Sequence, residues 1–158
     1  MRIAIAGPGY RQTPIVPLAS ELVRLGHDVH FVTFDSSIEK PVREYEGGLN
    51  IYYLPERKRA RHLALSFFSR EIAYLEEVLR GIRPEIVHAH WTYEFAEAAL
   101  RSGLPHLVTM HDSPWVVFAL YRDAYRFFRL LMALRTIPRI KALAVVSPCM
   151  IHHARLHG

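Results

Sequence analysis

The stretch that decides the fold is RIAIAGPGYRQTPIVPLASELVRLGHDVHFVTF, residues 2–34. An apolar run at residues 2–6 predicts a buried strand, and a glycine-rich turn follows it. Residues 15–25 repeat leucine at helical spacing, and Gly26 stands where a helix cap is needed, so this segment is predicted to be a helix. Residues 28–34 are rich in β-branched and aromatic side chains and predict a second strand. A strand, a helix and a strand in this order favour a parallel pair joined by a right-handed crossover.

The same alternation continues to the end of the chain. Further strands are predicted at residues 49–54, 84–90, 105–110 and 140–146, and helices at 61–81, 93–102, 114–134 and from Pro148 to Gly158. Strands separated by helices predict a doubly wound parallel sheet, a Rossmann-like α/β fold with three α/β/α layers. Because no internal repeat, low-complexity run or linker interrupts this pattern, residues 1–158 are predicted to form one domain.

Composition narrows the class of protein. Hydrophobic residues make up 51% of the 158 residues and charged residues 22%, a balance that excludes a disordered or fibrous chain. The single cysteine, Cys149, cannot form an intrachain disulfide, and no secretory leader precedes the first strand, so a cytoplasmic location is expected. The most apolar stretch, residues 115–134, contains four charged residues, which predicts an amphipathic or buried helix instead of a membrane span.

The charge of the chain is positive. A formal net charge of +5 and a pI near 9.6 favour anionic partners, namely nucleic acid, an anionic membrane face or phosphorylated substrates. Basic residues gather at 57–61 and again between 122 and 141, with phenylalanines and tyrosines nearby. This mixture suits a peripheral position on the inner membrane face, and its alternative is a pair of solvated helix faces whose aromatic rings lie in the core. Nucleic acid is not an expected partner, because no nucleic-acid reader motif is recognised.

The turn Gly7-Pro8-Gly9-Tyr10 follows the first predicted strand. In a doubly wound sheet, ligands collect beyond the carboxyl ends of the strands, so this turn is the first candidate site. Small residues let backbone amides approach a phosphate or sugar closely, although such a turn also occurs as packing geometry alone. The segment lacks both the G-x-G-x-x-G spacing of dinucleotide sites and the G-K-[ST] of a P-loop, which disfavours nicotinamide and ATP sites.

Histidines stand at the ends of two further strands. In His88-Ala89-His90-Trp91, alternation sends both histidines to the same side of the sheet and leaves His90 and Trp91 at its rim. His111 ends the strand at 105–110 in the same way. Two strand-end histidines favour a substrate site, although each could also be a satisfied polar residue of the scaffold.

Three alternatives to a substrate site at these strand ends remain at this stage. Asp112, which follows His111, and Ser113 are candidates to cap the helix that begins at Pro114. His88, His90 and His111 could be drawn as a metal site for hydrolysis, although no carboxylate follows the last predicted strand. The basic and aromatic segments could instead belong to a non-catalytic module that binds an acceptor or a membrane surface.

Five segments in order resemble the N-terminal domain of the GT-B-fold, family-four retaining glycosyltransferases. These segments are Gly7 to Gly9, Leu18 to Val29, Arg83 to Trp91, Thr109 to Asp112 and Val145 to Ser147. The resemblance covers nearly the whole chain. It implies two Rossmann-like domains facing each other across a cleft, with the acceptor mainly on the N-terminal half and the nucleotide sugar mainly on the C-terminal half.

The resemblance also assigns roles to residues. It places Gly7 and Gly9 near the donor phosphates, His111 against the transferred sugar as the catalytic residue, and His90 and Trp91 along the acceptor side. Asp112, Pro8 and Tyr10 fall within the matched or adjoining segments and are expected to contribute to substrate binding. Such enzymes retain anomeric configuration and commonly need no metal, so no cofactor is expected.

Two departures from the family pattern affect the expected activity. Pro8 separates glycines that the family usually has side by side, which stiffens the turn. The 158 residues also contain no counterpart of the donor domain, with its paired glutamates and its basic residues that grip the nucleotide diphosphate. We therefore expect the chain to need a C-terminal donor-binding domain or subunit, a nucleotide-sugar donor and a sugar or lipid-linked acceptor, and to lack efficient transfer by itself.

Overall fold

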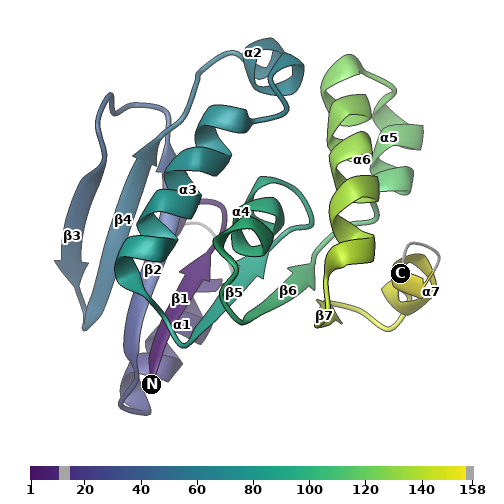
Figure 1. Ribbon diagram of the computed structural model, residues 1–158. Coiled ribbons are helices and arrows are strands. Elements are labelled where there is room, and N and C mark those ends of the chain that lie inside the picture. The colour runs from purple at the N-terminus through teal and green to yellow at the C-terminus, as the bar shows by residue number, and fades with distance from the viewer. Residues whose placement is uncertain (11–14, 156–158) are drawn as a thin grey trace.

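The computed structural model describes residues 1–10 and 15–155, and these form an α/β structure around one sheet of seven strands (Figure 1). The strands are β1 (Arg2–Ala6), β2 (Asp28–Asp35), β3 (Val42–Glu46), β4 (Leu49–Pro55), β5 (Ile86–His90), β6 (His106–Met110) and β7 (Leu143–Val145). The helices are α1 (Ile15–Arg24), α2 (Ala60–Leu65), α3 (Ser69–Ile82), α4 (Glu94–Ser102), α5 (Pro114–Tyr121), α6 (Ala124–Thr136), the 3-10 turn η2 (Ile137–Arg139) and α7 (Met150–Arg155). The strand order is β3-β4-β2-β1-β5-β6-β7, which confirms the doubly wound, Rossmann-like prediction.

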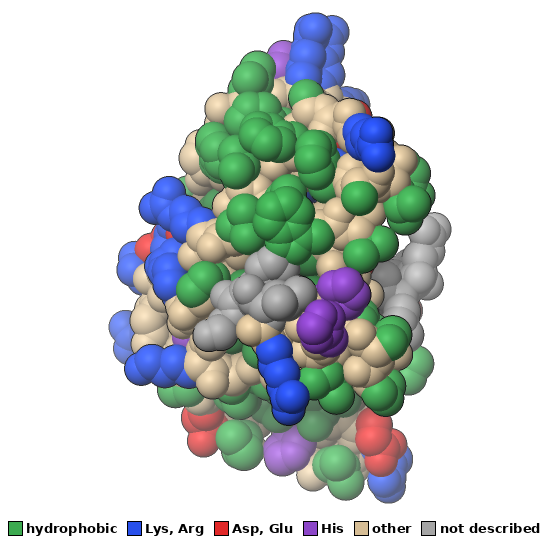
Figure 2. Space-filling view, turned by 90° about the vertical axis from the view of Figure 1, so that its right-hand side faces the viewer, with side chains coloured by type: hydrophobic (Ala, Val, Ile, Leu, Met, Phe, Trp, Pro, Cys, Tyr) green, Lys and Arg blue, Asp and Glu red, His purple; other side chains and the backbone are tan. Residues whose placement is uncertain are grey.

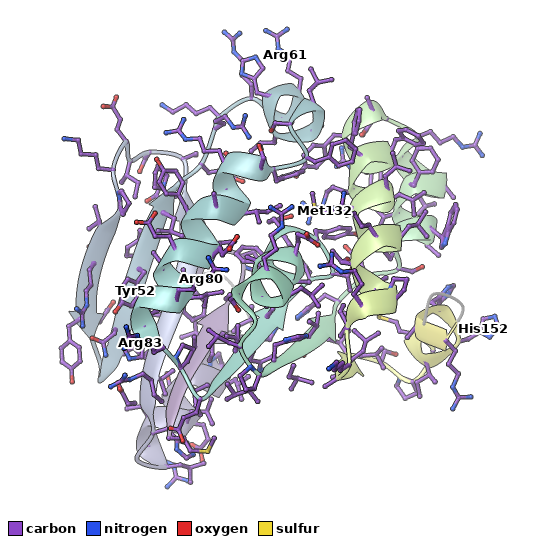
Figure 3. The ribbon with its side chains drawn as sticks, in the orientation of Figure 1. Tyr52, Arg61, Arg80, Arg83, Met132 and His152 are labelled. Carbon is purple, nitrogen blue, oxygen red and sulfur yellow. The ribbon has the colours of Figure 1, made fainter. Side chains whose placement is uncertain are left out.

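The two faces of the sheet carry separate cores, as the period of two in a strand requires. Ala4 and Ala6 of β1 join the core beneath α3, α4 and α6, whereas Ile3 and Ile5 pack with α1 on the opposite face. On the first face, Met132 lies on the side of α6 that faces α3 and α4 (Figure 3). The predicted three-layer arrangement is therefore confirmed.

The edge strand β3 departs from the predicted parallel sheet. β3 pairs antiparallel with β4, and the chain reverses between them at Gly47 and Gly48, whose φ angles are +58° and +84°. Two successive residues with positive φ are what a tight two-residue hairpin requires, and glycine adopts them at little cost. β3 was missed because all five of its residues are exposed, so it has no apolar run.

The helix predicted at residues 61–81 is interrupted, and α2 and α3 are separate. Phe67 and Phe68 between them have φ angles of +48° and +55°, and Phe68 is buried in the core. Packing of the Phe68 ring stabilises the turn between the two helices. Arg57, which turns inward, stabilises it further because it donates hydrogen bonds to Glu71 of α3 and to the Ser66 hydroxyl. Arg57 is therefore not part of a solvated basic cluster, whereas Arg61 on α2 points away from the protein (Figure 3).

The helix predicted at 114–134 is also divided. α5 ends at Arg122, whose φ is +47°, and α6 starts again because the Asp123 side chain accepts a hydrogen bond from the Arg126 amide at 2.8 Å. Such a cap satisfies an amide that the helix itself leaves open. The last strand is shorter than predicted, because β7 begins only at Leu143 and residues 140–142 belong to no helix or strand. The predicted end of the last helix at Gly158 lies outside the described residues.

Candidate functional site

The carboxyl ends of β1, β5 and β6 lie side by side, because these three strands are neighbours in the sheet and run parallel. Gly7 follows β1, His90 ends β5 and His111 follows β6. A Cβ atom built on Gly7 would come within 2.9 Å of the Ile15 Cδ1 atom and 3.2 Å of the His90 Cβ atom. A side chain at this position would therefore require Ile15 and His90 to move, and the backbone of the turn runs directly against the His90 side chain.

Three histidine rings form a contiguous row on the α1 side of this edge. The His88 and His90 ring centroids are 4.2 Å apart, and the His90 Nδ1 and His111 Nε2 atoms are 2.8 Å apart. The row is anchored at its inner end by a 2.7 Å hydrogen bond between His88 Nε2 and the Thr109 hydroxyl. The buried His90 Nε2 atom has no hydrogen-bond partner among the described residues. His90 thus orients the ring of His111.

These histidines are neutral near neutral pH. Burial lowers the pKa of His90 to about 3, with further lowering by His88 and His111. Burial also lowers the pKa values of His88 and His111, and Asp112 offsets part of the effect at His111. A neutral imidazole carries one donor and one acceptor, so His111 is suited to hydrogen-bond an uncharged ligand group.

The metal-hydrolase alternative finds no support in this geometry. In the part of the chain that the structure describes, no group of three or more His, Cys, Asp or Glu side chains is arranged to hold a metal ion. The His88 Nε2 atom is bonded to Thr109, and the His111 Nε2 atom to His90. These two ring nitrogens are therefore already engaged by hydrogen bonds within the protein.

The helix-cap interpretation is wrong for Asp112, and Ser113 is the cap residue of α5 by position alone. Asp112 accepts a 2.9 Å hydrogen bond from the Tyr93 hydroxyl. Ser113 occupies the N-cap position of α5, but within the described residues its side chain makes no capping hydrogen bond. Asp112 instead fixes the tyrosine that lies beside Trp91. Trp91 itself has a φ of +71°, and a strained backbone of this kind in a bulky residue is typical of functional sites.

Among the described residues, several hollows lie along the carboxyl edge, and three of them adjoin one another. A groove of about 750 Å³ lies over the ends of β2 and β4 and is bordered by Gly9 and Tyr10. A cavity of about 270 Å³ is bordered by Pro8 and Trp91, and a smaller one of about 150 Å³ by Trp91 and Asp112. The edge therefore places Gly7 against His90 and His90 against His111, and it sets the other predicted residues around the adjoining hollows.

Three charged residues of this edge were missed at the sequence level. Arg129 of α6 lies with its guanidinium carbon 3.9 Å from the Tyr93 ring centroid and 4.9 Å from that of Trp91. Glu94, at the start of α4, is buried beside it. Glu56 directly follows β4, so the strand-end rule applied to every strand would have found it. Arg129 and Glu94 had no such signal, because a charged residue inside a helix is usually exposed.

The described helices are not of the transmembrane kind, since none combines the length and apolar character needed to cross a bilayer.

Comparisons with known proteins agree with the fold. Residues 13–158 match the family model described as Glycosyl transferase 4-like domain, and no curated protein sequence matches. Similar solved structures include sucrose-phosphate synthase from Thermosynechococcus elongatus (13% identity, TM-score 0.70), UDP-GlcNAc 2-epimerase from Methanocaldococcus jannaschii (12%, 0.59) and alpha,alpha-trehalose-phosphate synthase (UDP-forming) from Burkholderia vietnamiensis (10%, 0.57).

These similarities cover 99%, 99% and 98% of this chain but only 45%, 42% and 42% of those structures, in the same order. The chain thus spans less than half the length of the structures it matches. At such low identities the structural likeness shows the fold, and the family model shows the family. The chain belongs to the glycosyl transferase 4-like domain family, and its fold is that of one half of a GT-B structure.

Proposed function

We propose that the chain is the N-terminal, acceptor-side half of a nucleotide-sugar-dependent, retaining glycosyltransferase. It transfers a hexosyl group to an acceptor hydroxyl in a cleft completed by a donor-binding domain or subunit, and it is inactive without that half. The observation that carries the proposal is the packing of Gly7 against His90 and of His90 against His111 at one sheet edge, in a chain of this family.

Each part of the edge has a role in this proposal. The turn from Gly7 to Gly9 lies near the donor diphosphate, which its small residues allow to approach the backbone closely, while the Gly7 amide itself donates a 3.1 Å hydrogen bond to the Val32 carbonyl oxygen. His111, oriented by His90, hydrogen-bonds the transferred sugar. The bond between the anomeric carbon and the diphosphate breaks, the acceptor oxygen bonds on the same face, and the acceptor proton leaves with the diphosphate. Positioning and electrostatic stabilisation of the leaving group supply the rate, with no metal.

The test measures binding and transfer with and without a donor-binding half. Calorimetric titration of the chain alone with UDP-glucose and GDP-mannose is expected to give no tight binding. The same chain joined to or mixed with a donor-binding half should bind one donor and transfer radiolabelled sugar. Tight donor binding together with transfer by the chain alone would overturn the proposal, because a complete site would then lie within these residues.

A peripheral position on an anionic membrane, at the cytoplasmic face, is the second part of the proposal. α5 is apolar along its whole length, yet of its eight residues, all described, only Pro114 is buried. Leu120 and Tyr121 are 73% and 63% exposed, and the exposed Arg122 follows them. Figure 2 shows apolar side chains gathered on this face with basic ones beside them. An apolar surface flanked by arginines suits the headgroup region of anionic lipids.

Flotation with vesicles tests the membrane proposal. The chain should float with phosphatidylglycerol vesicles and much less with phosphatidylcholine alone. Leu120→Asp should weaken flotation about tenfold or more, since burial of a leucine side chain contributes roughly 1.5–3 kcal/mol. The matched control is Leu25→Asp, because Leu25 is also exposed (58%) but lies just beyond α1. Equal flotation of both variants, or dimerisation through α5 without flotation, would contradict the proposal.

A further inference from the structure

The cavity of about 270 Å³ between the Pro8 turn and α6 combines apolar walls with buried charge. Among the described residues it is lined by Pro8, Phe34, Glu56, Trp91, Glu94, Phe95, Tyr125 and Arg129. Its volume lies near the lower end of small-molecule sites, roughly 300–1,000 Å³, and therefore suits a single sugar-sized ring. Phe34 and Glu56 also border the 750 Å³ groove, so the cavity adjoins the open edge of the sheet.

Glu94 places a buried carboxylate oxygen at this cavity, and no donor from the described residues reaches it. The residue is only 4% exposed, and its Oε2 atom has no hydrogen-bond partner within the described residues. Its other oxygen lies 3.7 Å from the Arg129 Nη2 atom, a distance too long for a good hydrogen bond. A buried carboxylate oxygen is stable when a donor reaches it, so a ligand hydroxyl would complete the site.

Arg129 holds the cavity wall and is not free to bind an anion. Its Nη1 atom donates a 2.9 Å hydrogen bond to the Tyr125 hydroxyl, and its guanidinium lies over the rings of Tyr93 and Trp91. Burial lowers the pKa of Arg129, but the Glu94 carboxylate and the two tyrosines raise it by more, so the group stays charged. The positive charge is therefore already balanced by Glu94.

Glu56 makes the cavity acidic overall. Burial, with the carboxylates of Glu94 and Glu71, raises the pKa of Glu56 to about 6, so this group is mostly ionised at neutral pH. The lining then holds two carboxylates against one guanidinium, which disfavours a phosphate or carboxylate and favours ligands that donate hydrogen bonds. This local charge is opposite in sign to the net charge of the chain.

We infer that this cavity binds a neutral, hydroxyl-rich ring of the acceptor, whose hydroxyls donate to Glu94 and Glu56 while its apolar face lies on Trp91. The inference rests on the proposed function, because only that function makes the ligand an acceptor. It narrows the acceptor class to a sugar unit without phosphate at this position. Aromatic rings offer such a ligand a flat apolar surface, and carboxylates accept from two adjacent hydroxyls.

Tryptophan fluorescence of the whole chain tests the inference without any donor. The chain contains two tryptophans, so a Trp115→Phe background leaves Trp91 as the reporter. Methyl α-D-glucopyranoside and methyl α-D-mannopyranoside are the neutral probes, and glucose 6-phosphate is the anionic probe. At least one neutral probe should give a saturable change, and glucose 6-phosphate should bind at least tenfold more weakly.

Two variants and one control assign the signal to the cavity. Glu94→Gln should weaken binding of the neutral probe about tenfold or more, as expected when a hydrogen bond to a charged group is lost. Glu56→Gln, at a half-buried position, should act in the same direction and serves if Glu94→Gln does not fold. Glu77→Gln, at an exposed position on α3, should leave binding unchanged.

The outcomes separate this inference from the proposed function. Equal or tighter binding of glucose 6-phosphate, no response to any neutral probe, or unchanged binding in both glutamine variants would overturn the inference. Saturable binding of a neutral sugar in a chain that never transfers with a donor-binding half would uphold the cavity and overturn the transferase proposal. Transfer to an acceptor that must carry phosphate in this cavity would uphold the transferase proposal and overturn the inference about the cavity.

Discussion

Replacing Arg57 by alanine is expected to destabilise the domain by about 3–5 kcal/mol, because it leaves a buried carboxylate without its partner. Arg57 Nε and Nη2 lie 2.9 Å and 2.6 Å from the two carboxylate oxygens of Glu71, whose side chain is fully buried. The same guanidinium bonds the Ser66 hydroxyl at 2.6 Å and so secures the turn between α2 and α3. Urea denaturation followed by circular dichroism measures the loss.

The destabilisation by Arg57→Ala should shrink as pH falls. In the native chain burial raises the pKa of Glu71, but the hydrogen bonds from Arg57 more than reverse this, and the net pKa lies below its ordinary value of 4.5. A depressed pKa contributes stability that is present above the unfolded pKa and is lost as pH falls through the folded one. Without Arg57, only backbone hydrogen bonds still oppose the effect of burial, so the pKa of Glu71 rises and the carboxylate takes up a proton more readily. The stability difference between the variant and the native chain should therefore be smaller at about pH 5 than at about pH 7.

Two further variants isolate the orphaned charge as the cause. The double substitution Arg57→Met and Glu71→Leu should recover most of the lost stability, since apolar replacement of a whole buried pair is often neutral. Arg24→Ala removes the partner of Glu21 on the exposed face of α1 and should leave stability nearly unchanged, because solvent screens an exposed ion pair. A loss for Arg57→Ala that is as small as that control, or that grows toward low pH, would contradict the argument.

Local sequence signals predicted the order of the elements but not the interruptions of the helices. The strands β1, β2 and β5 carry apolar runs, and glycines stand in the turns. The spacing of apolar residues and the positions of these glycines were therefore sufficient to predict the order of the elements. No propensity predicts Phe67 and Phe68 in the left-handed region, because the burial of Phe68 and the Arg57 bonds stabilise that turn only in the folded chain. The glycine pair before β4 is a hairpin signal that could have been used. It was overlooked because β3, the exposed strand on its other side, has no apolar run.

The candidate site was predictable to the extent that it depends on strand ends. Gly7, His90 and His111 could be placed at one edge because a doubly wound sheet gathers the carboxyl ends of parallel strands. Glu94 and Arg129 could not, because their importance arises from contacts between α4 and α6 that only tertiary packing creates. Each sits in a helical segment where a charged residue is ordinarily solvated.

In a complete enzyme containing this domain, His111→Ala is expected to lower kcat for transfer by about 10²–10³, the loss typical of removing one hydrogen-bond donor that stabilises a transition state. His111 is fixed by the 2.8 Å contact between its Nε2 atom and His90 Nδ1, and burial keeps the pair neutral by lowering both pKa values. KM for the donor should change much less than kcat, since the contact strengthens as the sugar leaves. Steady-state transfer of radiolabelled sugar measures both constants.

The control for this prediction must separate chemistry from folding, because truncation of His111 also leaves the buried His90 Nδ1 atom without its partner. That loss should cost about 1–3 kcal/mol of stability, visible as a lower Tm, while the variant stays folded at 25 °C. His152→Ala on α7, where the histidine is exposed, should keep both the native Tm and the native kcat. A folded His111→Ala enzyme that transfers at the native rate would remove His111 from the catalytic site, and the role of this edge would then rest on the turn at Gly7 and the cavity at Glu94.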